Sequence, residues 1–125
     1  MKSTDVFKKL RIDRSQKILI VNAPKEFIKT LGKLTYDTRP KTGKVYDFIQ
    51  IFATKQNDLE KLIKKHASAG KYDCIVWACY PKGTGSIPSD MKRETVWHAL
   101  SLGGLRPVSQ IAIDETWSAL RGRPV

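Results

Sequence analysis

Residues 72–86 read YDCIVWACYPKGTGS, an apolar run of strand length followed directly by a loop with a lysine and two glycines. The run does not alternate between apolar and polar residues, which is typical of a strand covered on both faces in a parallel sheet. Ligands of such sheets bind beyond the carboxyl ends of the strands. The stretch therefore predicts an α/β fold and indicates its loop as a candidate site.

Two further apolar runs, residues 17–23 and 45–53, precede this stretch and are also expected to be strands. Asn57 followed by Glu60 resembles a capping box and predicts a helix that Gly70 ends. A short amphipathic turn is expected at residues 4–10, a short helix at 26–31, and a loop at 32–44 with a brief extended piece at 34–38.

The chain after the glycine loop predicts a helix that starts at Pro88 and Ser89, with Asp90 as its local cap. Two strands follow, at residues 106–114 and 117–123. The gap between them is so short that they must form an antiparallel hairpin.

These elements predict one α/β domain over residues 1–125. The expected architecture is a three-layer α/β/α sandwich, Rossmann-like, with a mixed five-stranded sheet that ends in the antiparallel hairpin. Right-handed crossovers between the three parallel strands would place helices on both faces of the sheet.

The chain of 125 residues carries a net charge of +11. Residues 1–65 hold 16 Lys and Arg against 7 Asp and Glu, whereas residues 66–125 hold 7 against 5. Such an excess attracts polyanions, and it also keeps a small protein soluble. No apolar run is long enough for a membrane span and no secretory signal is evident, so we expect a cytoplasmic protein without a membrane partner.

The two cysteines, Cys74 and Cys79, are five residues apart within the expected strand. An odd separation points them to opposite faces of the sheet, so they should neither form a disulfide nor share a metal. We expect reduced, buried thiols and no metal site.

Four segments of the chain resemble a small bacterial family of uncharacterised α/β proteins. They are Ile18–Pro24 (ILIVNAP), Tyr46–Ile49 (YDFI), Tyr80-Pro81-Lys82 and Ile113–Arg121 (IDETWSALR). The resemblance covers nearly the whole chain, and it implies a fold rather than an activity.

The strand pattern of that family in turn resembles the core of class I methyltransferases, reduced in size. The resemblance implies a sheet order, by first residue of each strand, of 17, 45, 72, 117 and 106. The chain departs from the methyltransferase pattern after Ala23, where Pro24-Lys25-Glu26 replaces the glycines that let backbone approach a nucleoside. Too few residues separate the first two main strands for the usual cofactor cradle. The sequence therefore predicts no S-adenosylmethionine (SAM) and no other cofactor.

The candidate ligand residues lie at the carboxyl edge of the predicted sheet. The loop that starts at Lys82 combines a cation, flexible backbone and a following helix N-terminus, which suits an anion. The same loop could equally be a simple connection in which glycine makes the turns, and Asp114 and Ser118 could merely hydrogen-bond their own hairpin turn. The full set is Asn22, Tyr80, Lys82, Gly83, Gly85, Ser86, Asp114, Trp117 and Ser118.

Three functions follow from these observations. The leading hypothesis is a non-enzymatic module that binds an anionic small ligand or a protein partner at the carboxyl edge, with no catalytic residue. The second is nucleic-acid binding through the basic first half, by Lys8, Lys9, Arg11, Arg14 and Lys17. The third is a small enzyme of unknown reaction that uses Lys82, Ser86 or Asp114.

Overall fold

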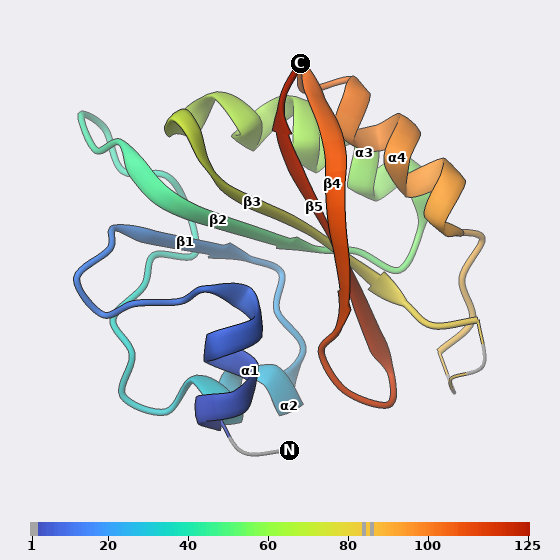
Figure 1. Cartoon of the computed structure of the whole chain (residues 1–125), viewed down its shortest axis with the longest axis horizontal. Coiled ribbons are helices and arrows are strands. Elements are labelled where there is room, and N and C mark those ends of the chain that lie inside the picture. Colours follow the sequence, from blue (N-terminus) through green and yellow to red (C-terminus); the bar gives the residue numbers. More distant parts are fainter. Residues whose placement is uncertain (1–2, 84, 86) are drawn as a thin grey trace.

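A five-stranded mixed sheet in the order β1-β2-β3-β5-β4 crosses the middle of the molecule (Figure 1). The computed structural model describes residues 3–83, 85 and 87–125. The three parallel strands are β1 (Ile18–Val21), β2 (Tyr46–Phe52) and β3 (Gly70–Pro81), and the antiparallel pair is β4 (Leu105–Ala112) and β5 (Trp117–Pro124). Both the predicted strand order and the predicted hairpin are confirmed.

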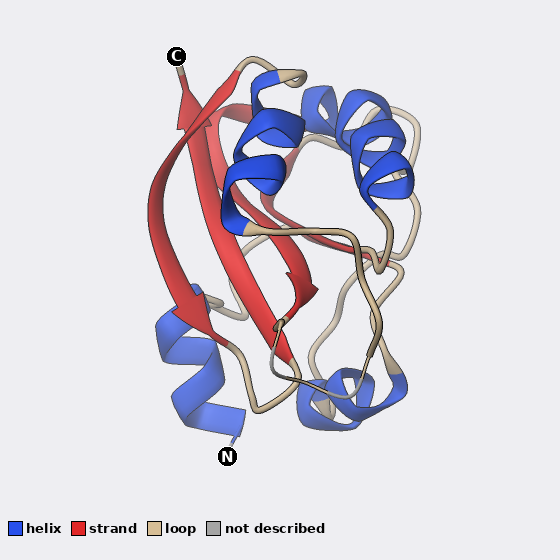
Figure 2. Cartoon of the chain, turned by 90° about the vertical axis from the view of Figure 1, so that its right-hand side faces the viewer, coloured by secondary structure: helices blue, strands red, loops and turns tan. Residues whose placement is uncertain are grey.

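Helices cover the two faces of the sheet in two separate layers (Figure 2). One layer contains α1 (Ser3–Leu10) and α2 (Lys25–Leu31). The other contains α3 (Gln56–His66), which a short 3-10 turn (Ala67–Ala69) follows, and α4 (Arg93–Ser101). This confirms the predicted three-layer α/β/α architecture.

The parallel strands β1 and β2 are buried on both faces, and so is β3 from Val76 onward, as their unbroken apolar sequences predict. In β2, Phe48 and Phe52 pack under α1 and α2, whereas Ile49 and Ile51 pack under α3 and α4. A further contact closes the first layer: the indole Nε1 of Trp77 on β3 donates a hydrogen bond of 2.9 Å to the carbonyl oxygen of Leu10, at the end of α1.

The two cysteines lie on opposite faces of β3, as predicted. Cys79 is in the core beneath α1 and α2, and Cys74 packs against the core beneath α3 and α4. Burial raises the pKa of Cys79 to about 12 and that of Cys74 to about 11. Both thiols are therefore protonated at neutral pH and act as small apolar side chains.

The predicted starts of the last two helices are wrong. Helix α3 begins at Gln56, and the backbone N–H of Gln56 donates to Asp90 Oδ1 at 2.9 Å, so a distant loop supplies this helix with its cap. Helix α4 begins only at Arg93, where the N–H of Lys92 donates to Thr95 Oγ1. Asp90 precedes α4 by three residues and caps the neighbouring helix instead of its own.

Gln50 on β2 is fully buried with an incomplete set of hydrogen bonds. Its Nε2 lies 3.5 Å from Cys79 Sγ, while its Oε1 is buried without a partner among the described residues. An unsatisfied buried carbonyl destabilises a protein by about 1–3 kcal/mol. Gln50 is therefore a weak point of the core.

We expect the Gln50→Met variant to be more stable than the wild type by about 1 kcal/mol, because methionine has a similar shape without the unpaired oxygen. The corresponding rise in Tm is about 3–5 °C. Urea unfolding with an unchanged m-value checks the free energy. A Tm that falls below that of the wild type would show that the amide is needed.

Candidate functional site

Those polar residues of the predicted set that the structure describes lie along the carboxyl edge of the sheet, but not in one pocket. Asn22 follows β1 directly with a left-handed backbone, φ 63°. Its side-chain Nδ2 donates a hydrogen bond of 2.9 Å to the carbonyl oxygen of Phe52, so it ties the ends of β1 and β2 together.

Asp114 supports the hairpin turn. Its Oδ1 accepts hydrogen bonds from the backbone N–H groups of Thr116 and Trp117, both at 2.8 Å. This is the local arrangement typical of an aspartate in a turn. One carboxylate oxygen of Asp114 is thus occupied by the turn itself.

Tyr80, Trp117 and Ser118 are largely buried, with exposed fractions of 5%, 5% and 8%. Tyr80 packs beneath α3 and α4, and its hydroxyl accepts a hydrogen bond from Gln110. Trp117 packs beneath α1 and α2, edge-on against the ring of Phe52. Tyr80 and Trp117 therefore face opposite layers and cannot touch one small ligand.

Lys82 follows β3 and lies beside the hairpin turn. Its backbone N–H donates to the carbonyl oxygen of Thr116 at 2.8 Å, and the N–H of Gly85 donates back to the carbonyl oxygen of Lys82. Lys82 and Asp114 line an open cavity of about 670 Å³. Gly83 has open space on its side-chain side, and Ser86 lies outside the described residues.

A second segment pairs with β1 on the side opposite to β2. Leu19 and Asp37 form an isolated parallel bridge, with hydrogen bonds of 2.9 Å from Ile20 N to Asp37 O and from Asp37 N to Ile18 O. The extended piece predicted at 34–38 is therefore present. The chain leaves β1, pairs on one side of it, and then returns to the other side as β2, so the end of β1 is a topological switch point.

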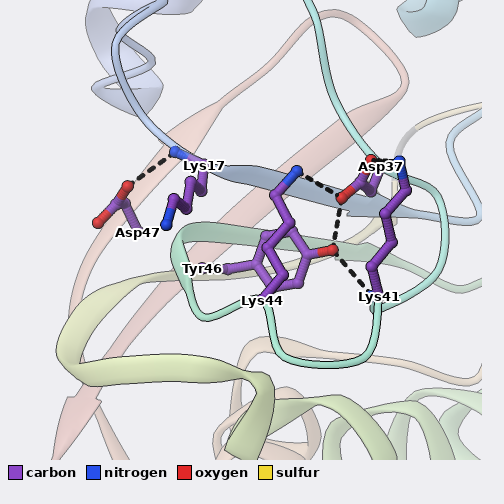
Figure 3. A network of polar contacts seen from close by, with 6 residues as sticks. All are labelled: Lys17, Asp37, Lys41, Lys44, Tyr46 and Asp47. Atoms are coloured by element: carbon purple, nitrogen blue, oxygen red, sulfur yellow. Dashed lines mark hydrogen bonds and ion pairs between the residues drawn. The ribbon is translucent and has the colours of Figure 1, made fainter.

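A polar network holds this second segment in place (Figure 3). Asp37 Oδ2 accepts from Lys44 Nζ at 2.9 Å and from the hydroxyl of Tyr46 at 2.5 Å, and Asp37 Oδ1 lies 3.3 Å from Lys41 Nζ. The hydrogen bonds from Lys44 and Tyr46 lower the pKa of Asp37 to about 2. The backbone N–H of Lys17 donates to Asp47 Oδ2 at the start of β1.

A groove of about 960 Å³ opens at the switch point, between α3 and the residues that follow Asp37. We call it the switch-point groove. Its residues on α3 recur at the spacing of one helix face. The lining is Val21, Asn22, Thr38, Arg39, Pro40, Asp58, Lys61, Leu62, Lys65 and His66.

The switch-point groove carries more positive than negative charge. Arg39, Lys61 and Lys65 contribute three cations, and Asp58 contributes one carboxylate. His66 is only 4% exposed, and its Nδ1 is buried without a partner among the described residues. Burial, and then the charge of Lys65, lower the pKa of His66, so the imidazole is neutral at pH 7.

Sequence reasoning missed this groove except for Asn22. The spacing of Asp58, Lys61, Leu62 and Lys65 shows that they share a helix face, which the sequence alone could have indicated. The opposite wall, Thr38 to Pro40, depends on the pairing of Asp37 with β1, and the local sequence contains no signal for it.

The five cations expected to bind nucleic acid, Lys8, Lys9, Arg11, Arg14 and Lys17, are all exposed. Lys9 lies against the hairpin, with its Nζ 3.5 Å from the carbonyl oxygen of Ala112. Within the described part of the chain, no group of three or more His, Cys, Asp or Glu could hold a metal ion. None of the described helices is both long and apolar enough to cross a membrane.

We expect Asp37→Asn to lower the free energy of unfolding by about 1–2 kcal/mol at pH 7. Because the folded pKa of about 2 is below the ordinary 3.8, the carboxylate's contribution is present above about pH 4 and is lost as the pH falls towards 2. Urea unfolding between pH 2 and pH 7 checks this. The exposed Asp5→Asn is the control and should change stability by less than about 0.5 kcal/mol. Equal acid sensitivity of wild type and Asp37→Asn would contradict the assignment.

Comparisons with known proteins show which solved structures share this fold. No family model matches the sequence, and no curated protein matches it. Solved structures do match. One is magnesium protoporphyrin IX methyltransferase (ChlM) from Synechocystis PCC 6803 with bound SAH, at 9% identity and a TM-score of 0.65. The match spans 98% of this chain and 83% of the methyltransferase chain. A SAM-dependent methyltransferase from Aquifex aeolicus follows, at 13% identity and a TM-score of 0.62, over 98% and 89%. The 4+2 cyclase SpnF matches at 10% identity and a TM-score of 0.63, over 98% and 80%.

These matches support the predicted methyltransferase-like core, while the bacterial family suggested by the four sequence segments gains no support from them. At such identities the likeness establishes the fold alone. The prediction of a non-enzymatic binding module is nevertheless wrong: all three of these structures, which extend over 98% of the chain, are enzymes.

Proposed function

We propose that this protein is a small-molecule-modifying enzyme that binds SAM in the switch-point groove. The observation that carries the proposal is the position of the groove. It opens where β1 and the parallel segment at Asp37 both end, the place at which α/β sheets bind nucleoside ligands.

The chemistry of the groove lining fits such a ligand. Asp58 forms no ion pair among the described residues and can accept hydrogen bonds from ribose hydroxyls or an ammonium group. Arg39, Lys61 and Lys65 can hold a carboxylate. Val21 and Leu62 offer apolar surface to a base. Pocket sizes of about 300–1,000 Å³ are usual for small ligands, and this groove lies within that range.

The missing glycines after β1 are partly replaced by Asn22. Asparagine is one of the few residues other than glycine that readily adopt a left-handed backbone, and Asn22 does so at φ 63°. Its side chain is held by the carbonyl oxygen of Phe52. The chain can therefore turn sharply at the end of β1 without glycine, which the sequence-based exclusion of SAM did not consider.

Bound SAM supplies an electrophilic methyl group. The chain's own residues would hold the ligand and favour an anionic substrate, since the groove has an excess of cations. His66 stays neutral and adds no further charge to repel a cationic ligand.

The proposal predicts that SAM and SAH bind to the wild type and that Asp58→Ala weakens binding at least tenfold, because the lone carboxylate of the groove is lost. Isothermal titration calorimetry measures the affinity. A SAM concentration of 100 times Kd should stabilise the fold by about 2.7 kcal/mol. Lys64→Ala, on the same helix but not in the groove lining, is the matched control. No binding of SAM, SAH or adenosine at millimolar concentration would refute the proposal.

The anion site predicted at Lys82, Gly83, Gly85 and Asp114 is proposed as the place for an anionic group of the substrate. Its support is the cation of Lys82 in the cavity at the end of β3, which the carboxylates of Asp114 and Glu115 also line, two strands or about 10 Å from β1.

We expect inorganic phosphate to raise the Tm of the wild type by about 1–2 °C more than that of Lys82→Ala, because the lysine charge is lost. Phosphate also stabilises proteins by exclusion from their surface, so the difference between variants is the relevant quantity. Lys92→Ala is the control. Equal shifts in all three proteins would eliminate this site.

A further inference from the structure

One face of the C-terminal hairpin is not covered by a helix. In Figure 2, α1 lies against the lower part of the hairpin on this side, and no helix lies over the part near the C-terminus. Arg121 on β5 pairs with Trp77 on β3, and directly opposed residues of an antiparallel pair point to the same side. Because Trp77 packs beneath α1, Arg121 points to the uncovered side.

Four arginines gather on this face. Arg123 lies two residues beyond Arg121 on β5, and Arg106 on β4 is paired with Arg123. Arg11, which follows α1, is close enough to lower the pKa of Arg121, as is Arg123, although burial lowers it more. We call these four residues the arginine face: Arg11, Arg106, Arg121 and Arg123.

The charge of the arginine face is poorly compensated. Asp73 accepts two hydrogen bonds from Arg123, at 2.9 Å from Nε and 2.6 Å from Nη2, and among the described residues it forms no other ion pair. The Nε of Arg121 is buried without a hydrogen-bond partner in the described part of the chain. Like charges opposed across a sheet, such as Arg106 and Arg123, destabilise it. A polyanion would relieve this repulsion.

An exposed aromatic ring adjoins the arginines. Tyr72 at the start of β3 is 86% exposed, and it directly precedes Asp73, the residue that binds Arg123. Residues two apart on a strand are separated by about 6.8 Å, so Arg121 and Arg123 can address different phosphates of one chain. Exposed aromatic rings beside a basic surface are how proteins bind single-stranded nucleic acid, by stacking on unpaired bases.

We propose that the arginine face and Tyr72 form a docking surface for single-stranded nucleic acid. The guanidinium groups hold phosphates and Tyr72 stacks on a base. Lys9 on α1, whose Nζ lies 3.5 Å from the carbonyl oxygen of Ala112, adds a further exposed cation beside the hairpin. This surface is independent of the switch-point groove, because it lies on β4, β5 and the start of β3 rather than at the end of β1.

The test is fluorescence anisotropy with a labelled 12-nucleotide oligo-uridine between 50 and 200 mM salt. Three phosphate contacts predict a log–log salt slope of about −2 and an affinity loss of about 20-fold over this range. Arg121→Gln/Arg123→Gln should bind at least tenfold more weakly and reduce the slope by about 1.4. Tyr72→Ala should lose at least about fivefold with an unchanged slope, since stacking is not ionic.

The control is Lys64→Gln/Arg93→Gln, which removes the same charge from α3 and α4 on the other side of the sheet. Circular dichroism verifies folding, and the exposed Arg106→Gln replaces the double variant should that variant unfold. The proposal is overturned by a control that loses as much affinity as Arg121→Gln/Arg123→Gln. It is equally overturned by no binding at 50 mM salt, or by a duplex that binds as tightly as the single strand.

Discussion

The central strands β2 and β3 are covered on both faces, and this constraint determines where the rest of the molecule can be polar. Phe48, Ile49, Ile51 and Phe52 are completely buried, and helices lie on either side of them. A strand of this kind leaves no room for a functional side chain along its length. Apart from the buried Gln50, the polar side chains of β2 and β3 therefore lie at the strand ends.

The two outer strands of the sheet, β1 and β4, differ in what lies along their outer edges. Beside β1, the segment at Asp37 adds a short parallel pairing, and the ion pairs of Asp37 with Lys41 and Lys44 hold it there. The switch-point groove opens beyond this segment. At the other side of the sheet, β4 remains an edge strand with exposed polar side chains such as Arg106 and Ser109. Charge on an edge strand also opposes unwanted pairing with another chain.

The methyltransferase fold limits the function without specifying it. The solved structures that share this fold include both methyltransferases and a cyclase, so the reaction must be argued from the site. In this chain one short segment pairs with β1 at Asp37, and Asn22 supplies the left-handed turn. The groove at this place is basic, and Asp58 is the one carboxylate among its described lining residues.

The pattern of residues along the chain predicted the strands and the layers, and the resemblance to methyltransferases implied the order of the strands. Unbroken apolar runs indicate that a strand is covered on both sides, and a connection as short as the four residues between β4 and β5 favours a hairpin. The folded molecule was needed to show which polar groups contact one another. Asp90 caps α3, Asp37 pairs with β1, and Arg11 joins Arg121 from the other end of the chain. The periodicity of a sequence indicates whether a residue is buried. It does not indicate which distant residue becomes its partner, because that depends on how the layers pack.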